Sequence, residues 1–397
     1  MGRILRSAHR CCGFGILALL VACESSGPSD NQPRITSVSA GATSTCALSE
    51  AGQAYCWGSP YAEPPTVQQR PDTVAAALRF RELKLASNTF GNAVCGVTSD
   101  DRGYCWGTLL VGYDMGMIIG ETPQPFGDIS LQTIAVGSRH YCGLAVGGAA
   151  YCAGDYTGGV RGTGSATGEF PEPDLVPNQV AGGLSFTQLA LGLGNSCGLS
   201  GGQAYCWGSE VALGTTSAVL HPEEECGYTI PPFSGRCSHL PVPVEGGHTF
   251  VTLAAGQTHV CGITSDGSVY CWGGNDSGQL GTGDTVYSAN PVKAALEAPA
   301  ASISLGGSFS CALTTGGLAY CWGLNHVGQV GSGSGLTMML LPAPVNQPTT
   351  YRTISAGWSH ACGIRTTGAL YCWGAGDSGQ LGTGSLENST IPVRVEF

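Results

Sequence analysis

Two short apolar runs flank a polar turn in a pattern that recurs along the chain. In its most complete copy, residues 260–263 and 269–272 are apolar, and the turn between them contains Asp266 and a glycine. Asp-Gly between two β-prone runs is a strong signal for a β-hairpin. A hairpin centred on Asp266 places Cys261 opposite Cys271, at the separation where cross-strand side chains touch. The aromatic residues beside the second cysteine then point to the other face, so both faces are expected to be buried.

Seven copies of this hairpin can be recognised by their cysteines. The pairs are Cys46 and Cys56, Cys95 and Cys105, Cys142 and Cys152, Cys197 and Cys206, Cys261 and Cys271, Cys311 and Cys321, and Cys362 and Cys372. Six of the second cysteines precede Trp-Gly, whereas the third copy has Ala153 at the tryptophan position. We predict a disulfide across each hairpin.

Each hairpin is preceded and followed by a further short strand. Upstream, apolar residues lie three apart and usually precede a glycine. Downstream, the motif G-Q-L-G-T-G (278–283 and 379–384) or G-Q-V-G-S-G (328–333) leads into a strand that contains Pro-Val. Residues 75–85 look briefly helical, but Phe80 and Leu83 align with the upstream strand of the other copies, so a strand is predicted there.

These repeats predict an all-β, seven-bladed β-propeller with four short strands per blade. Residues 35–397 divide into seven units of about 52 residues, which suits a four-stranded blade. Packing of each blade between two neighbours explains strands that are apolar on both faces. An open solenoid is the alternative. We expect the ring to close by pairing the strand near 35–39 with strands near 392–396, which leaves no exposed edge.

The N-terminus has the features of an export signal. Three arginines precede an apolar run from 11 to 22 that is too short to span a bilayer, a pattern typical of a signal peptide over 1–22. The run ends in Leu-Val-Ala-Cys23, which resembles a bacterial lipobox, so Cys23 is expected to carry lipid. The alternative is an apolar N-terminus with an incidental cysteine. Residues 23–34, rich in Ser, Gly and Pro, are expected to form a flexible tether.

The cysteine count favours an oxidising compartment. Of 19 cysteines, three belong to the signal and the lipid site, and 14 of the other 16 form the hairpin pairs. The last two, Cys226 and Cys237, complete eight predicted disulfides. Zinc binding is the alternative for paired cysteines, but the hairpin pairs lie about ten residues apart across a turn and not in C-x-x-C knuckles.

The chain is acidic. Its net charge of −11 becomes −14 once the three signal arginines are removed. This balance argues against nucleic acid or anionic lipid as a partner.

The repeat G-x-x-H-x-C-x-[LI]-x-x-x-G-x-x-Y-C-W-G-x-N-x-x-G-Q-L-G-x-G resembles that of the regulator of chromosome condensation family, in the cysteine-bearing form of exported bacterial members. The resemblance covers essentially all of 35–397 and implies a propeller. Copies one to three lack a full G-Q-L-G-T-G, and copy three lacks its tryptophan. Nuclear members exchange nucleotide on a small GTPase and bind chromatin. An exported, acidic chain is expected to meet neither partner.

Two motifs could suggest ligand binding. G-Q-L-G-T-G could cradle phosphate, but such loops need a helix N-terminus after them; here a strand follows, which favours a turn. His140, His259 and His360 each lie two residues before a hairpin cysteine and could form a metal-binding ring. The equivalent residues in the other copies are Ser44, Ala93, Asn195 and Phe309, so a structural hydrogen-bonding role is expected. We predict no catalytic residues, metal or cofactor.

The most individual segment is an insertion at about 209–247. Insertions in repeat proteins map to loops on one face, often the binding face. A Cys226–Cys237 bridge would reduce the ordering cost of binding. The candidate partner-binding residues are Glu223, Glu224, Glu225, Tyr228, Phe233 and Arg236. The alternatives are an insertion without function and a zinc site made of His221, Cys226, Cys237 and His239.

The sequence therefore predicts a non-catalytic lipoprotein of the bacterial cell envelope, at the outer membrane or cell surface, that presents propeller loops to a protein or glycan. The alternatives are a secreted enzyme inhibitor, as implied by one inhibitor of β-lactamases with this type of propeller, and a hydrolase or lyase of extracellular polymers.

Overall fold

A computed structural model of the chain describes residues 32–59, 67–86, 92–111, 115–155, 157–164, 174–218, 220–221, 226, 235–346 and 349–397. The predicted signal peptide, Cys23 and nearly all of the tether lie outside these residues. The described loops include the 3-10 helices η1 (Thr157–Gly159) and η2 (Glu210–Ala212). None of the helices in the described ranges has the length and hydrophobicity to span a lipid bilayer.

The described strands form six antiparallel sheets, five of four strands and one of seven. The four-stranded sheets contain β1 (Ile35–Ala40), β2 (Ser44–Ser49), β3 (Ala54–Gly58) and β4 (Gln68–Val74); β12 (Gln188–Leu191), β13 (Asn195–Ser200), β14 (Gln203–Ser209) and β15 (Cys237–Pro243); β16 (Phe250–Ala255), β17 (His259–Thr264), β18 (Val269–Gly273) and β19 (Ser288–Lys293); β20 (Ala300–Leu305), β21 (Phe309–Thr314), β22 (Ala319–Leu324) and β23 (Met338–Pro344); and β24 (Tyr351–Ala356), β25 (His360–Arg365), β26 (Leu370–Gly374) and β27 (Ser389–Arg394).

The seven-stranded sheet consists of two four-stranded units that share one strand. Its strands are β5 (Phe80–Leu85), β6 (Val94–Thr98), β7 (Arg102–Val111), β8 (Met115–Val136), β9 (His140–Ala145), β10 (Ala150–Gly154) and β11 (Asp174–Gln179). The long strand β8 pairs with β7 up to Ser130 and with β9 from Leu131 onward. The strand predicted from Phe80 and Leu83 is β5, so the repeat alignment was the better guide than the helical composition.

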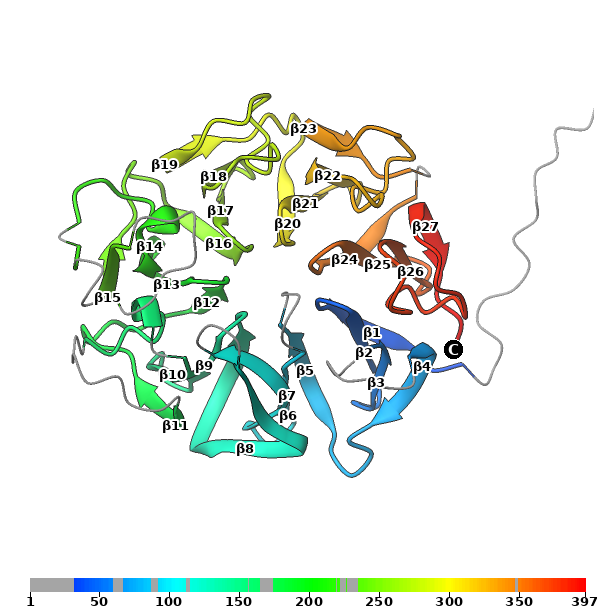
Figure 1. The fold of residues 1–397 in the computed structure, drawn as a ribbon, viewed down its shortest axis with the longest axis horizontal. Coiled ribbons are helices and arrows are strands. Elements are labelled where there is room, and N and C mark those ends of the chain that lie inside the picture. The colour runs from blue at the N-terminus through cyan, green and yellow to red at the C-terminus, as the bar shows by residue number, and fades with distance from the viewer. Residues whose placement is uncertain are drawn as a thin grey trace, which may run out of the picture. The chain divides into compact units, whose positions relative to one another are not determined.

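The first strand of each four-stranded unit lies innermost in a ring. The strands β1, β5, β8, β12, β16, β20 and β24 contact one another in cyclic order (Figure 1). They line a central channel of about 370 Å³. The prediction of an all-β propeller is confirmed.

The predicted mode of ring closure is wrong. Among the described strands, β1 pairs only with β2, and β27 pairs only with β26. The ring closes instead by face-to-face packing, in which Ile35 and Trp57 share a core cluster with Ile364 and Leu381. The reason is that each end of the chain supplies a complete four-stranded unit, so no strand position is left for the other end to fill.

The hairpin register agrees with the sequence prediction, because Cys261 lies opposite Cys271. All seven hairpin pairs are disulfides, with Cα atoms 4.0–4.1 Å apart. The bonded pairs are Cys46 with Cys56, Cys95 with Cys105, Cys142 with Cys152, Cys197 with Cys206, Cys261 with Cys271, Cys311 with Cys321, and Cys362 with Cys372. Cys226 and Cys237 are joined as well, with a wider Cα separation of 5.9 Å.

Both faces of the hairpins are buried. Five tryptophans that follow the second cysteine are among the largest fully buried side chains, and the cysteines of the hairpin pairs are buried too. The expectation from the alternation of side chains along each strand therefore holds.

Candidate interaction face

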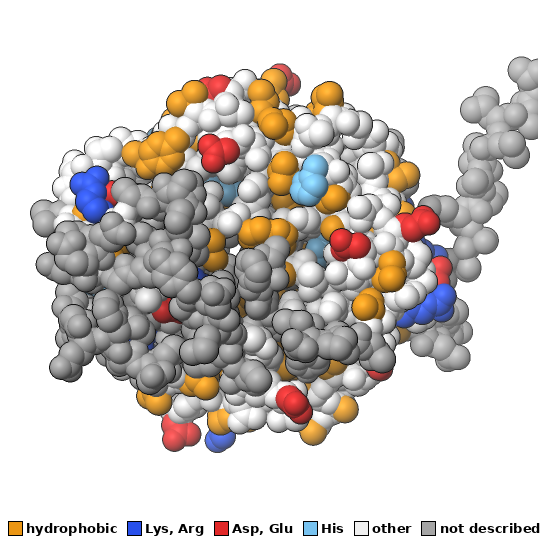
Figure 2. Space-filling model, in the orientation of Figure 1, with side chains coloured by type: hydrophobic (Ala, Val, Ile, Leu, Met, Phe, Trp, Pro, Cys, Tyr) orange, Lys and Arg blue, Asp and Glu red, His pale blue; other side chains and the backbone are white. Residues whose placement is uncertain are grey.

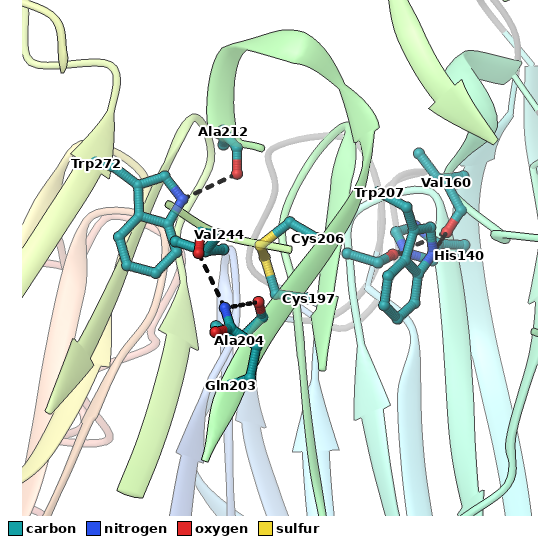
Figure 3. Close-up of a disulfide and its surroundings, with 11 residues drawn as sticks. His140, Val160, Cys197, Gln203, Ala204, Cys206, Trp207, Ala212, Val244 and Trp272 are labelled. Carbon is teal, nitrogen blue, oxygen red and sulfur yellow. Dashed lines mark hydrogen bonds between the residues drawn. A yellow bond between two sulfur atoms is a disulfide. The ribbon is translucent and has the colours of Figure 1, made fainter. Parts of the chain in front are cut away.

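Five loops tie one unit to the next through the indole of a tryptophan. The indole Nε1 of Trp322 donates to the Gln279 carbonyl at 2.9 Å, and Trp207 makes the equivalent bond to Val160 at 2.9 Å (Figure 3). Gly281 has φ +72°, and a Cβ added there would lie 2.7 Å from the Trp322 indole nitrogen. A side chain at this position would therefore displace the tryptophan. The predicted role of G-Q-L-G-T-G as a turn is confirmed.

The three predicted structural histidines make a second link between units. Their Nε2 atoms contact hydroxyl oxygens of the following unit, in the pairs His140–Ser196 (2.6 Å), His259–Ser310 (2.9 Å) and His360–Thr45 (2.8 Å). Each hydroxyl donates its one hydrogen to the loop carbonyl that also accepts the indole N–H. It must therefore accept from Nε2–H, which fixes Nε2 as the nitrogen that carries the hydrogen in each imidazole.

Burial keeps these imidazoles neutral. It lowers the pKa of His259 and of His360 to about 3, and the pKa of His140, which also lies near Arg139, to about 3. The histidines lie at three separate junctions between units and do not converge. The predicted hydrogen-bonding role is confirmed.

The third unit replaces its missing tryptophan with residues from its neighbour. Ala153 is buried in one cluster with Leu109 of β7 and Ile119 of β8. These two strands form an extended hairpin where other units carry a glycine-rich loop. The mostly apolar stretch 109–119 was the available sequence signal for this substitution, which was not predicted.

The long connections gather at one end of the ring. Consecutive strands in each unit are antiparallel, so the connections between third and fourth strands emerge at the same end. In units one and three to seven, these connections have 9 to 27 residues, whereas the turns between the second and third strands have 2 to 4 residues. We call this end the variable-loop face. On the face shown in Figure 2, hydrophobic and acidic side chains are interspersed and Lys and Arg are few.

The described residues of the insertion lie on the variable-loop face, and the insertion is shorter than predicted. The interval 209–247 contains β15, the fourth strand of its unit, and the Ala212 carbonyl that accepts from Trp272 Nε1 at 3.1 Å. Thr215 Oγ1 donates to the Glu245 carboxylate at 2.7 Å and so links the start of the insertion to the segment after β15. Hydrogen bonds from Ser217 and Thr215 lower the pKa of Glu245 to about 2. The carboxylate is therefore negatively charged when it accepts these hydrogen bonds.

A cavity of about 510 Å³ lies beside the insertion. Glu210, Arg236, Asp276 and Tyr287 contribute to its lining, and Arg236 pairs with Glu210 at 2.9 Å. Partial burial, together with the charge of Glu210, raises the pKa of Tyr287. The predicted residue Arg236 is therefore at the cavity. The other candidates, Glu223, Glu224, Glu225, Tyr228 and Phe233, lie outside the described residues.

Glu210 and Tyr287 were not among the residues predicted from the sequence. Tyr287 had a usable signal, because it is an aromatic residue at a position where units six and seven have Thr337 and Asn388. Glu210 begins η2 and had none, since a single acidic residue after a strand is common.

The four residues of the zinc alternative come together at the base of the insertion. His239 Nε2 lies 3.6 Å from Cys237 Sγ, and the rings of His221 and His239 are 4.8 Å apart. The two sulfurs are bonded to each other in this state.

Comparisons with known proteins agree with the repeat pattern. A model of the regulator of chromosome condensation (RCC1) repeat matches residues 35–61, 250–279, 300–329 and 351–380, and a second model of this repeat matches 266–313 and 367–397. The ultraviolet-B receptor UVR8 of Arabidopsis thaliana is 27% identical over 204 residues, which are 50% of this chain and 42% of UVR8. The chain thus spans less than half the length of that relative.

Two solved structures have the same fold. Human WBSCR16 superimposes with a TM-score of 0.69 at 17% identity, covering 86% of this chain and 89% of that one. Yeast RCC1 (Prp20), solved with Kap60 bound, gives 0.54 at 19% identity, covering 91% and 75%. These two structures show the fold, and the repeat matches show that the chain carries repeats of the regulator of chromosome condensation family.

Proposed function

We propose that the protein is a non-catalytic scaffold that binds a protein partner through the variable-loop face. The main support is a separation of roles within the described residues. The features that recur from copy to copy, namely the histidines, tryptophans and glycine-rich loops, are used to join one unit to the next. What differs between units lies in the long connections at one end of the ring.

The variable-loop face offers apolar anchors in an acidic setting. Val286, Leu336 and Leu386 occupy corresponding loops of units five, six and seven and are 68%, 62% and 45% exposed. These loops, 274–287, 325–337 and 375–388, contain four Asp or Glu residues and no Lys or Arg. A partner that presents apolar side chains beside lysines or arginines fits this surface.

Protein binding also agrees with one relative. Yeast RCC1, which shares the fold at 19% identity, was solved with Kap60 bound. That similarity supports a protein as the class of partner and does not identify it. The site of action that we propose is the bacterial cell envelope, with the chain held there by lipid on Cys23.

The experiment compares matched surface variants. The partner is first isolated from envelope extract with the full mature chain, and its affinity is then measured for Leu336→Asp and Leu386→Asp. Loss of an apolar anchor is expected to weaken binding roughly tenfold or more. Val146→Asp and Leu318→Asp are the controls, because these exposed residues lie in turns at the opposite end of the ring.

Equal effects of the two sets of variants would exclude the variable-loop face. A partner that is an enzyme and loses activity on binding would favour the inhibitor alternative. Turnover of a glycan or other polymer by the purified chain would overturn a non-catalytic role.

A further inference from the structure

The base of the insertion holds a cluster of metal-ligand types that the proposed function does not use. Within the described residues, Cys226, Cys237 and His239 are the one group of three His, Cys or carboxylate ligands whose donor atoms all lie within 4.8 Å of one another. All three are buried. The ring of His221 lies against that of His239, at 4.8 Å between centroids, so a fourth ligand is adjacent.

The spacing of this cluster suits a tetrahedral zinc site. Zinc–sulfur and zinc–nitrogen distances of about 2.3 and 2.0 Å place the sulfur and nitrogen of such a site about 3.5 Å apart. Cys237 Sγ and His239 Nε2 are already 3.6 Å apart. Two changes are required. The disulfide sulfurs must separate to about 3.8 Å, and a ring nitrogen of His221, which is not among the three clustered ligands, must move closer to them.

This bridge differs from the seven hairpin disulfides. Each hairpin bridge joins residues directly opposite on two paired strands, as Cys261 and Cys271 do. The bridge at the insertion instead joins Cys237, the first residue of β15, to Cys226, which lies outside the sheets. The sulfur of Cys226 can therefore move without breaking a strand ladder.

We propose that reduction of the Cys226–Cys237 bond converts this cluster into a zinc site with Cys226, Cys237, His239 and His221 as ligands. A dithiol reductant supplies two electrons and two protons to the disulfide and leaves as its own disulfide. Zn²⁺ then displaces the two thiol protons and is held by two thiolates and two neutral imidazoles. The metal takes over from the disulfide in closing the insertion.

This ligand set selects the class of metal. Two thiolates and two imidazoles in a buried, four-coordinate site suit Zn²⁺ and exclude Mg²⁺ and Ca²⁺, which take oxygen ligands. The proposal is independent of partner binding, because it concerns metal affinity alone.

The test is a Co²⁺ and Zn²⁺ titration of the full mature chain after limited reduction. Alkylation and peptide mass analysis first establish that Cys226 and Cys237 are the free thiols. Co²⁺ is then expected to give the visible bands of a tetrahedral site and a thiolate charge-transfer band, at one metal per chain, and Zn²⁺ is expected to displace it. The oxidised chain is expected to show neither band.

Matched histidine variants distinguish the histidines that bind the metal from one that does not. His239→Asn and His221→Asn are expected to weaken Co²⁺ binding by roughly a hundredfold or more, since loss of a ligand exceeds loss of an outer-shell partner. His248→Asn, just beyond β15, is expected to leave it unchanged. Disulfide mapping of each oxidised variant checks that the fold is intact.

Three results would overturn the proposal. The first is the absence of thiolate charge transfer, and the second is Co²⁺ binding that is equal in His239→Asn and His248→Asn. The third is a Cys226–Cys237 bridge that resists reductant until the hairpin disulfides have opened.

Discussion

The buried histidines make the protein sensitive to acid at the level of single residues. The folded chain holds the pKa of His259 at about 3, whereas an unfolded histidine titrates near 6.5. Between these values the unfolded state binds more protons than the folded state. The contribution of His259 to the free energy of unfolding is therefore fully present above about pH 6.5 and declines as the pH falls toward 3. Each such histidine contributes a slope of up to about 1.4 kcal/mol per pH unit.

We predict that His259→Gln makes the free energy of unfolding less dependent on pH. Gln retains an N–H that can donate to Ser310 but has no proton to bind in this range. Denaturant unfolding between pH 4 and 7 measures the slope, which is expected to decrease by about one proton. His326→Gln is the control, because His326 is exposed in the loop of unit six. An unchanged slope in His259→Gln would contradict the assignment.

The hydroxyl partners of these histidines could have been found in the sequence. His140, His259 and His360 belong to copies three, five and seven. The residues Ser196, Ser310 and Thr45, each just before a first cysteine, belong to copies four, six and one. No other copy has a serine or threonine there, so the two residue types are correlated between adjacent copies. Comparing copies at the same position could not detect a pairing that joins one copy to the next.

The glycine-rich loop is the element that fixes the contact between adjacent units. Gly331 has φ +73°, and an added Cβ would lie 2.5 Å from Trp373 Nε1, whose hydrogen the Gln329 carbonyl accepts at 3.1 Å. Two penalties therefore combine in Gly331→Ala, a left-handed backbone that disfavours a side chain and a collision with a buried indole.

We predict that Gly331→Ala lowers the free energy of unfolding by about 2–4 kcal/mol. Gly335→Ala, four residues later in the same connection, meets no atom within 4 Å and is expected to change stability by less than about 0.5 kcal/mol. The denaturant midpoints of the two variants measure this difference in stability. Similar midpoints would mean that the loop adapts and does not fix the tryptophan.

The strands and turns were predictable where the repeat is complete. They were not predictable where residues of one copy fill the core of another. Hairpin register followed from the cysteine spacing, because side chains alternate along a strand. The extended hairpin of β7 and β8 was not expected. It fills the space around Ala153 from the preceding unit, and this compensation is visible only when the neighbouring copies are considered together.

At the scale of the whole molecule, the ring was predictable and its closure was not. Seven repeats of about 52 residues indicate a propeller, but they do not say where in a blade the chain begins. That starting point decides whether the ends share a sheet. Here β1 begins a unit and β27 completes one, so closure relies on the same contacts as the other junctions. The bond from Trp57 Nε1 to the Gln380 carbonyl at 2.9 Å is one of them.

Because the unit that carries the insertion has all four of its strands, the ring should tolerate loss of the insertion. The part that can be removed is 216–235, since η2, Thr215 and β15 all belong to the framework. We predict that replacing 216–235 with a short Gly-Ser linker, combined with Cys237→Ser to avoid an unpaired thiol, leaves a folded propeller. Far-UV circular dichroism, disulfide mapping of the seven hairpins and the thermal midpoint test this.

The matched control is Trp272→Ala, which removes a fully buried side chain and the bond to the Ala212 carbonyl. It is expected to lower the free energy of unfolding by about 3–5 kcal/mol, whereas the loop replacement is expected to change it far less. If the replacement destabilises the chain as much as Trp272→Ala does, the insertion is part of the framework. Its sequence would then be constrained by packing against units four and five and could not be free to vary for a partner.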